Sequence, residues 1–558
     1  MKKYISSALV LFIILSVTGE IAASDKVLPT EWVSIVNDRT LYITGEEIHF
    51  SARVFMEENA GIPSSSILYV ELISPQGQSF VSNKYSILNS GAHGYLSIPE
   101  DLITGIYYLK AYTKYMRNFG PDDYVYVPLK IINPKVDDVL GGKDLTPYKE
   151  TFQTDHTLNG FFTITTDVNE YSARQDVLVN VDLDQAGQKE WLNVSVAVVP
   201  ESANQVFALP VYHHTSSIPE YYPDTRGISL TGKLKDIRTR REIAGTRINL
   251  SIIGKGRDFM ATETDSTGRY FFSLPVYSGY RDIFLGVEKE DTSHFQLLID
   301  NDFCSLPVHL PSPAFTLSDE ERRTAYTMAL NRQINAQFNV DTMECPNEFE
   351  ADEKAFYGTP SEIINLDNYI ALPTLEEYFN ELPGAVNVRK KNGHKYFKVL
   401  GTQPEMSYYK PLVLVDYVAV NNPEKILAAT PASISRIEVV RLPYIKGDIT
   451  YGGIVSIISK KGDFGGIDLP SSGIFLDYHF LSDSCHCNIP PEQSPNEPDA
   501  RNTLYWNPDL QLGKNEAATF SFSTPDVPGK YRIWVKGIDS SGNVEMQSKA
   551  IVVRKQTD

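Results

Sequence analysis

The chain has 558 residues, of which 42% are hydrophobic and 11% aromatic. This composition is typical of a folded protein and not of a disordered one, and the length predicts about three to five domains. The formal charge of −19 at pH 7 repels nucleic acid and anionic lipid head groups, so neither is expected as a partner.

The start of the chain predicts export. Two lysines in residues 1–3 precede an apolar stretch at 6–17, and Ala22-Ala23-Ser24 is a small-residue cleavage site. Residues 1–24 are therefore predicted to be a signal peptide, with the mature chain beginning at Asp25. No membrane-spanning segment is expected, because the apolar stretch is too short and no later run approaches about 18 apolar residues. No cysteine near the cleavage site could carry a lipid anchor.

Residues 25–135 carry the alternating pattern of a β-sandwich. Ile48, Phe50, Ala52 and Val54 share one face of a predicted strand. The motifs YxxGExIxF at 42–50 and LxxGxYxLxAYTxYMRN at 102–118 resemble the macroglobulin (MG) domains of bacterial alpha-2-macroglobulins and their relatives in Bacteroidetes. The resemblance implies a fibronectin-like sandwich that serves as scaffold.

A second sandwich is predicted at 148–205, from alternating segments at 161–166, 176–183 and 192–200. Residues 206–227 are predicted to be a linker. Its adjacent histidines, His213 and His214, would point to opposite faces of a strand, which does not favour a metal site.

Residues 228–310 are predicted to form a third sandwich. Asp265 and Gly268 suit a tight hairpin turn, since Asp can bond the turn backbone and Gly tolerates positive φ. The order of strands around this turn resembles the carboxypeptidase regulatory-like domain, which has no catalytic residues. The resemblance implies that Asp265 forms a turn and is not a catalytic acid.

Residues 316–340 are predicted to form one helix that serves as a spacer. Ser318 and Glu321 form a capping box. Tyr326, Leu330 and Ile334 follow at intervals of four residues, with Ala325 and Met328 nearby, so the helix is expected to pack on its neighbours.

Residues 360–463 resemble the plug of an outer-membrane TonB-dependent receptor. A short helix candidate at 374–379 is followed by a β-rich run at 411–416, an alternating strand at 435–441 and the motif YGGIVSIISKKG at 451–462. Tyr417 stands where this family usually has glycine, and residues 446–448 depart from its pattern. A barrel that encloses such a plug has about 22 strands. Too few residues follow for one, so this chain is not expected to be the transporter.

Four tyrosines of this segment are candidate interface residues, because such side chains combine a large area with a polar tip. The alternative is that they fill the core of their own domain. The four are Tyr408, Tyr409, Tyr417 and Tyr444.

Residues 471–558 are predicted to form a C-terminal sandwich. The pattern TLYWNPxL at 503–510, followed by ATFSFxxPDxxGxYRIxVxGxDxxG from residue 518, resembles another macroglobulin domain. The fold class expected for the whole chain is mainly β, with tandem immunoglobulin- or fibronectin-like sandwiches and one small α/β plug-like domain.

The four cysteines are candidate disulfide partners, as expected for an exported protein. Cys304 and Cys345 flank the predicted helix and could bridge, while Cys485 and Cys487 enclose a histidine. Four cysteines allow three pairings. A zinc site and free thiols stay open as alternatives, although tetrahedral zinc needs ligands from more than one segment.

Catalytic motifs are absent from the sequence. It has no Cys-Gly-Glu-Gln thioester, no Gly-x-Ser-x-Gly elbow, no His-Glu-x-x-His helix and no phosphate-cradling loop. Neither enzymatic activity nor a cofactor nor a metal is expected.

Two functions are compatible with these patterns. The favoured hypothesis is a non-enzymatic exported scaffold or binding protein of the outer membrane, periplasmic or on the cell surface, that joins an outer-membrane protein such as a TonB-dependent receptor or another barrel. The alternative is an accessory of TonB-dependent uptake that binds a ligand or TonB through its plug-like domain.

Overall fold

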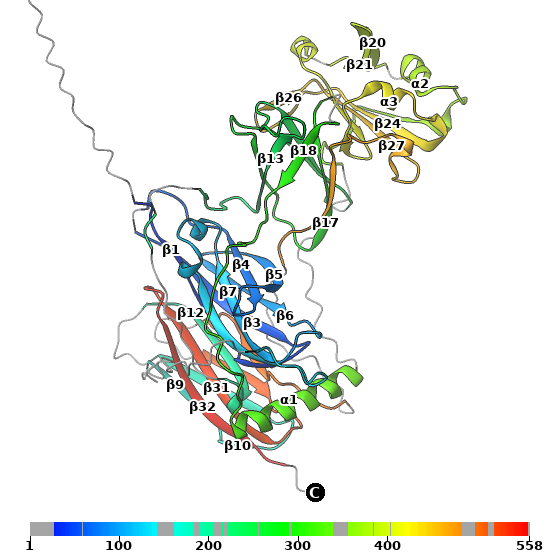
Figure 1. Cartoon of the computed structure of the whole chain (residues 1–558). Helices are drawn as coiled ribbons and strands as arrows, with labels where there is room; N and C mark the ends of the chain where they lie inside the picture. Colours follow the sequence, from blue (N-terminus) through cyan, green and yellow to red (C-terminus); the bar gives the residue numbers. More distant parts are fainter. Residues whose placement is uncertain are drawn as a thin grey trace, which may run out of the picture.

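The computed structural model of the chain describes residues 27–58, 60–141, 161–183, 190–204, 214–216, 220–254, 256–289, 293–338, 355–382, 384–401, 403–482, 497–511 and 518–555. Within these residues the strands form nine sheets, and the prediction of a mainly β chain is confirmed. The predicted signal peptide lies outside the described residues. Figure 1 shows two sandwiches at one end of the molecule, and a third sandwich with a mixed α/β unit at the other end.

The N-terminal sandwich packs sheet β1-β3-β6 against sheet β2-β8-β7-β4-β5. Alternation explains the pairing, because Ile48 and Phe50 point inward from β3 and are fully buried. Two 3₁₀ turns, Tyr115–Asn118 and Pro121–Asp123, follow β7. The strands are β1 Glu31–Asn37, β2 Leu41–Ile43, β3 Glu47–Met56, β4 Ile67–Ile73, β5 Ser79–Ser86, β6 Gly91–Ser97, β7 Gly105–Tyr112 and β8 Val125–Ile132.

The second sandwich is assembled from two distant parts of the chain, and we call it the split sandwich. Its sheets are β10-β32-β31-β12-β29 and β30-β11-β9. The strands are β9 Phe162–Thr166, β10 Glu170–Tyr171, β11 Asp176–Leu183 and β12 Trp191–Pro200, with β29 Tyr505–Asn507, β30 Ala518–Ser523, β31 Gly529–Asp539 and β32 Val544–Val553.

The prediction of separate sandwiches at 148–205 and 471–558 is therefore wrong. Val177 of β11 pairs with Phe522 of β30, and Val196 of β12 pairs with Val535 of β31, so the two segments share one core. The physical reason is that each segment alone has too few strands to cover its apolar face. A 3₁₀ turn at Glu201–Ala203 ends the first part.

The third sandwich is inserted between the two parts of the split sandwich, and we call it the inserted sandwich. Sheet β16-β13-β18 packs against sheet β15-β14-β17-β28. Its last strand, β28, was predicted to belong to the C-terminal domain, but it pairs with β17 over six residues. The strands are β13 Ser229–Asp236, β14 Arg247–Ile252, β15 Asp258–Glu263, β16 Arg269–Ser273, β17 Tyr280–Val287, β18 Phe295–Ile299 and β28 Ile474–His479.

The predicted turn before β16 is present. The Asp265 carboxylate accepts the backbone N–H groups of Thr267 and Arg269, and Gly268 has a φ of +72°. Asp265 therefore forms a turn.

A mixed unit at 355–467, which we call the sheet unit, lies beyond the inserted sandwich. Its central sheet has the order β19-β24-β27-β22-β23, with two hairpins beside it. The elements are β19 Glu362–Asn365, η4 Leu366–Asn368, α2 Leu375–Glu381, β20 Val386–Lys391, β21 His394–Val399, η5 Pro404–Tyr408, β22 Leu412–Val415, β23 Val418–Ala419, α3 Pro423–Leu427, η6 Pro431–Ser433, β24 Ile434–Val440, β25 Tyr444–Lys446, β26 Ile449–Tyr451, β27 Ile454–Ser459 and η7 Phe464–Gly466.

Helix α1, Asp319–Gln337, lies against both lower sandwiches (Figure 1). Its predicted capping box is present, since Ser318 and Glu321 bond each other's backbone N–H groups. The buried side carries Ala325 and Met328, which pack with Leu41, Ile43 and Ala203.

The apolar repeat predicted for this helix does not make that contact. Tyr326 is 75% exposed and Leu330 is 46% exposed. Small Ala325 and unbranched Met328 can approach the sandwiches closely. Glu321 reaches Lys130 of β8, with 2.6 Å between Oε1 and Nζ.

The joint between the N-terminal and inserted sandwiches is made by three chain segments, 224–229, 300–304 and 478–482. Lys84 Nζ lies 2.5 Å from the Asp302 carboxylate, which also accepts the hydroxyl of Tyr478. Lys114 Nζ donates to the backbone oxygen of Ser229 at 3.0 Å. Because the groups are buried, desolvation lowers the pKa of both lysines.

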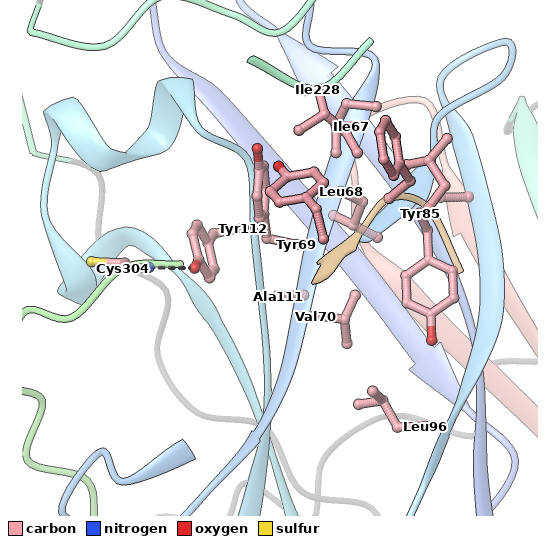
Figure 2. Close-up of a cluster of buried hydrophobic side chains, with 14 of the residues drawn as sticks. Ile67, Leu68, Tyr69, Val70, Tyr85, Leu96, Ala111, Tyr112, Ile228 and Cys304 are labelled. Atoms are coloured by element: carbon pink, nitrogen blue, oxygen red, sulfur yellow. Dashed lines mark hydrogen bonds between the residues drawn. The ribbon is translucent and has the colours of Figure 1, made fainter. Parts of the chain in front are cut away.

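An apolar cluster continues through this joint. Ile67, Tyr69 and Tyr85 of the N-terminal sandwich belong to the same buried cluster as Ile228, which leads into β13 (Figure 2). The two sandwiches therefore share a continuous core.

Cys304 lies in the segment at 300–304 that leaves the inserted sandwich after β18, which we call the strap. Its backbone N–H donates to the Tyr112 hydroxyl at 2.7 Å (Figure 2). Its buried sulfur is not part of a disulfide. The Tyr124 hydroxyl donates to the Cys304 sulfur at 3.3 Å. Cys345, Cys485 and Cys487 lie outside the described residues, so disulfide formation stays a prediction. Among the described residues, no helix combines the length and the apolar character needed to cross a membrane.

A buried polar network joins the N-terminal sandwich to the split sandwich. Arg39 lies 2.9 Å from the Glu46 carboxylate and also donates to the Thr503 hydroxyl. Lys536 of β31 donates to the backbone oxygen of Asn37, and burial lowers the pKa of its ammonium from 10.5 to about 8.

The lowered pKa of Lys536 predicts that the protein becomes more stable as the pH rises. Between about pH 8 and 10.5 the unfolded chain binds more protons at Lys536 than the folded chain, so the free energy of unfolding increases with pH in that window. From about pH 7 to about pH 9.5 the increase should be about 2 kcal/mol. Urea unfolding should show this rise, and Lys536→Met should remove it. Lys530→Met, on the exposed end of the same strand, is the matched control and should retain it.

Candidate protein-docking surface

Both faces of the central sheet in the sheet unit are covered from within the chain. One face packs on α2, α3 and the β20–β21 hairpin, with Phe379 and Phe397 at a ring distance of 4.8 Å. The other face packs against the inserted sandwich through Phe259 of β15, which is fully buried. The strands thus need no surrounding wall to bury their apolar side chains.

Aromatic and charged side chains fix the contact between the two units. Phe259 lies 6.0 Å from both Phe356 and Tyr451, measured between ring centroids. Lys446 of β25 forms an ion pair with Asp258 of β15, with 3.0 Å between Nζ and Oδ1. The sheet unit is therefore attached by a buried aromatic centre with an ion pair beside it.

Tyr417 is part of this contact. It occupies the two-residue turn between β22 and β23, where Asp416 and Tyr417 have φ values of +45° and +70°. Positive φ at both turn positions suits a hairpin of this length but disfavours a bulky residue. The Arg257 guanidinium lies 4.4 Å from the centre of the Tyr417 ring. The ring of Tyr357 stacks on the Tyr417 ring, with 6.3 Å between their centroids.

The neighbouring Asp416 holds the same turn in place. Its carboxylate accepts the Ser459 N–H at 2.8 Å, the Ser459 hydroxyl at 2.6 Å and the Phe464 N–H at 2.8 Å. These bonds and the contacts of Tyr417 offset the backbone strain.

Tyr444 is half-buried and packs against the same contact. Its ring is 5.8 Å from Phe356 and 6.3 Å from Tyr451, and burial raises the pKa of its phenol. Tyr417 and Tyr444 therefore serve the contact between the sheet unit and the inserted sandwich, which neither interpretation of the sequence had assigned to them.

Tyr408 and Tyr409 have a different position. They end the η5 turn, where Tyr408 is 85% exposed and Tyr409 is 49% exposed. The turn itself is fixed, because Met406 is buried against Gly401 and the Lys410 backbone oxygen accepts the Gly452 N–H at 2.9 Å. Gly452 has no room for a side chain, since an added Cβ would lie 2.5 Å from the backbone oxygen of Tyr409.

Two further exposed apolar residues lie at this end of the sheet, where β24 ends and β27 begins. Leu400 is 40% exposed and Leu442 is 56% exposed. Arg441 links their segments by donating from Nε to the Leu400 backbone oxygen at 3.0 Å. We define Leu400, Tyr408, Tyr409 and Leu442 as the aromatic edge.

The described residues contain no group of three or more His, Cys, Asp or Glu side chains that could hold a metal ion. His214, considered in the sequence as half of a metal pair, instead contacts the buried carboxylate of Asp123. His213 lies outside the described residues.

Sequence reasoning missed three residues of the internal contact: Phe259, Phe356 and Tyr357. The Tyr357 hydroxyl donates to Glu438 of β24 at 2.6 Å, and Phe356 stacks on Phe259. The adjacent aromatic pair at the start of the sheet unit was an available signal, but its partner Phe259 is about 100 residues earlier in the chain and could not be inferred.

No protein-family model and no curated protein match the chain. Among solved structures, 94% of the chain aligns with 39% of a Salmonella alpha-2-macroglobulin reacted with methylamine, at 10% identity and a TM-score of 0.24. It aligns equally far with 44% of an Escherichia coli alpha-2-macroglobulin activated by porcine elastase, at 8% identity and the same TM-score. Half of the chain aligns with the D0-D1 domain of Intimin, covering 97% of it at 9% identity and a TM-score of 0.14.

The chain thus spans about two fifths of the macroglobulins with which it aligns.

The turn at Tyr417 predicts an unusual order of stability among variants. Tyr417→Ala and Tyr417→Gly both lose the stacking with Tyr357 and Arg257, but only glycine relieves the positive φ. The alanine variant should therefore be less stable than the glycine variant by about 1 kcal/mol. Urea unfolding of both variants beside the parent chain measures this difference, and an alanine variant as stable as the glycine variant would contradict the strain.

Proposed function

We propose that this chain is a non-enzymatic, exported scaffold protein of the outer membrane that docks a protein partner through the aromatic edge of its sheet unit. The observation that carries the proposal is Tyr408, a large aromatic side chain that is 85% exposed on a segment whose backbone is fixed. Exposed tyrosines on a rigid frame contribute contact area at a small entropic cost.

The architecture supports a scaffold. Two sandwiches and α1 form one end of the molecule, and the inserted sandwich carries the sheet unit at the other end (Figure 1). The shared core and the buried Lys84–Asp302 ion pair at the joint favour a fixed separation between the two ends. The aromatic edge is thereby held away from the split sandwich.

The plug-like sequence motifs and the predicted signal peptide support an outer-membrane partner, such as a TonB-dependent receptor or another barrel. The internal coverage of both sheet faces supports a docking role over pore gating, because a gating plug depends on a wall that this chain replaces with its own inserted sandwich.

The direct experiment is capture of solubilised outer-membrane proteins by the purified chain. Tyr408→Ala combined with Tyr409→Ala should weaken capture of a specific partner at least about tenfold, since interface hot spots each contribute more than about 1 kcal/mol. Melting should be unchanged, because exposed substitutions alter stability by less than about 0.5 kcal/mol.

Tyr326→Ala is the matched control, because this tyrosine is 75% exposed on α1, at the other end of the molecule. It should leave capture unaffected. Equal capture by the double variant and the parent chain would refute the docking role of the aromatic edge. Ligand transfer to a purified receptor, without stable capture, would favour the accessory of TonB-dependent uptake instead.

A further inference from the structure

The β20–β21 hairpin is a basic element in an acidic chain. Five Lys or Arg residues and no Asp or Glu lie in residues 382–404, whereas the whole chain has a formal charge of −19. The two strands are joined at Asn392-Gly393, where both residues have positive φ, as a two-residue hairpin turn requires. Figure 1 shows the hairpin at the outer end of the sheet unit.

Strand alternation separates the hairpin into two faces. The inner face carries Val386 and Val388 opposite Val399 and Phe397, and it packs toward α2 through the contact of Phe397 with Phe379. The outer face therefore consists of three cross-strand pairs, which are Asn387 with Lys398, Arg389 with Tyr396, and Lys391 with His394.

The outer face is accessible to solvent, and its cations form no ion pair with the residues that the structure describes. Arg389 and Lys391 are exposed, and Tyr396 between them is 40% exposed. Within the described part of the chain, Arg389, Lys391 and Lys398 make no ion pair, in contrast to Lys395 on the inner face, which lies 2.6 Å from Glu376. One carboxylate lies near the edge of the outer face, where Glu424 is 3.9 Å from His394.

We propose that this outer face binds the phosphate groups of an anionic lipid surface. Lysine and arginine near an anionic membrane each add to binding through the surface potential. Tyrosine suits the interface between head groups and acyl chains because its ring is apolar and its hydroxyl is polar. Arg389, Lys391 and Lys398 surround such a tyrosine on one face of the hairpin.

The negative charge of the whole chain does not oppose this contact. At physiological ionic strength, charges separated by more than about 8 Å are largely screened from one another. A hairpin at the outer end can therefore meet an anionic surface while most of the acidic residues stay beyond that range. The net charge of the whole chain argued against binding to anionic head groups. Within the screening distance of about 8 Å, however, the positive charge of the hairpin determines whether the surface is attracted.

An acidic protein segment is the other ligand that a basic face could take. Two features favour lipid. Protein interfaces are depleted of lysine at their core, whereas two of the three cations here are lysines. These flexible side chains also suit laterally mobile phosphates better than carboxylates at fixed positions. The inference does not depend on the aromatic edge or on the proposed partner.

The test is co-sedimentation of the purified chain with lipid vesicles. Binding is expected to vesicles that contain phosphatidylglycerol, not to pure phosphatidylcholine, and should weaken when the salt concentration is raised. Replacing Arg389, Lys391 and Lys398 with Gln together should lower the partition coefficient for the anionic vesicles at least about tenfold. Circular dichroism and the melting temperature should stay unchanged, since the three side chains make no ion pair with any residue that the structure describes.

A matched control changes the net charge equally at another exposed site. Arg238, Arg240 and Arg241 lie in the exposed turn after β13, and replacing all three with Gln should leave vesicle binding intact. Equal loss in both triple variants, equal binding to neutral vesicles, or no binding to anionic vesicles would each overturn the proposal. Tighter binding to poly-glutamate than to anionic vesicles would also overturn it in favour of an acidic protein.

Discussion

The arrangement of this molecule depends on charges buried at the joint between its N-terminal and inserted sandwiches. Lys84 and Lys114 meet Asp224 and Ser229 of segment 224–229 and Asp302 of segment 300–304. Buried ions are costly unless each is paired and hydrogen-bonded, so displacing any one segment would leave a charge without its partner. Such a joint specifies one orientation more strictly than an apolar contact does.

This constraint explains how an insertion can be rigid. The inserted sandwich interrupts the split sandwich, and its entry and exit both return to the N-terminal sandwich, where Ser482 donates to the Lys84 backbone oxygen at 2.8 Å and Ser66 donates to the Asp224 backbone oxygen at 2.6 Å. The strap after β18 adds a third attachment through Cys304 and Tyr112. The sheet unit is then held by Phe259, Tyr417 and Lys446 on the opposite side of the same sandwich. Its exposed aromatic edge and basic hairpin are the surfaces left over when these internal contacts are complete.

Local features were predicted well from the sequence. The capping box of Ser318 and Glu321, the turn at Asp265 and Gly268, and the alternating strand from Ile48 to Val54 depend on residues within a few positions of one another, so local pattern is sufficient. The candidate site was predicted less completely. Tyr408 and Tyr409 are exposed, whereas the equally aromatic Tyr417 and Tyr444 pack at the contact with the inserted sandwich, and composition cannot distinguish these positions.

The sequence by itself determined that the chain is mainly β, where most strands and turns lie, and which segments carry apolar faces. Only the tertiary structure decided which faces meet. A strand's alternation states that one side must be buried but does not identify the strand that covers it. Val177 is therefore consistent with a sandwich of its own, yet it pairs with Phe522. Likewise, Tyr326 and Leu330 repeat with helical spacing, but the side of α1 that could approach the sandwiches closely carries Ala325 and Met328. Pairing over long distances is a competition among many similar apolar faces, and close packing, which short-range pattern does not record, resolves it.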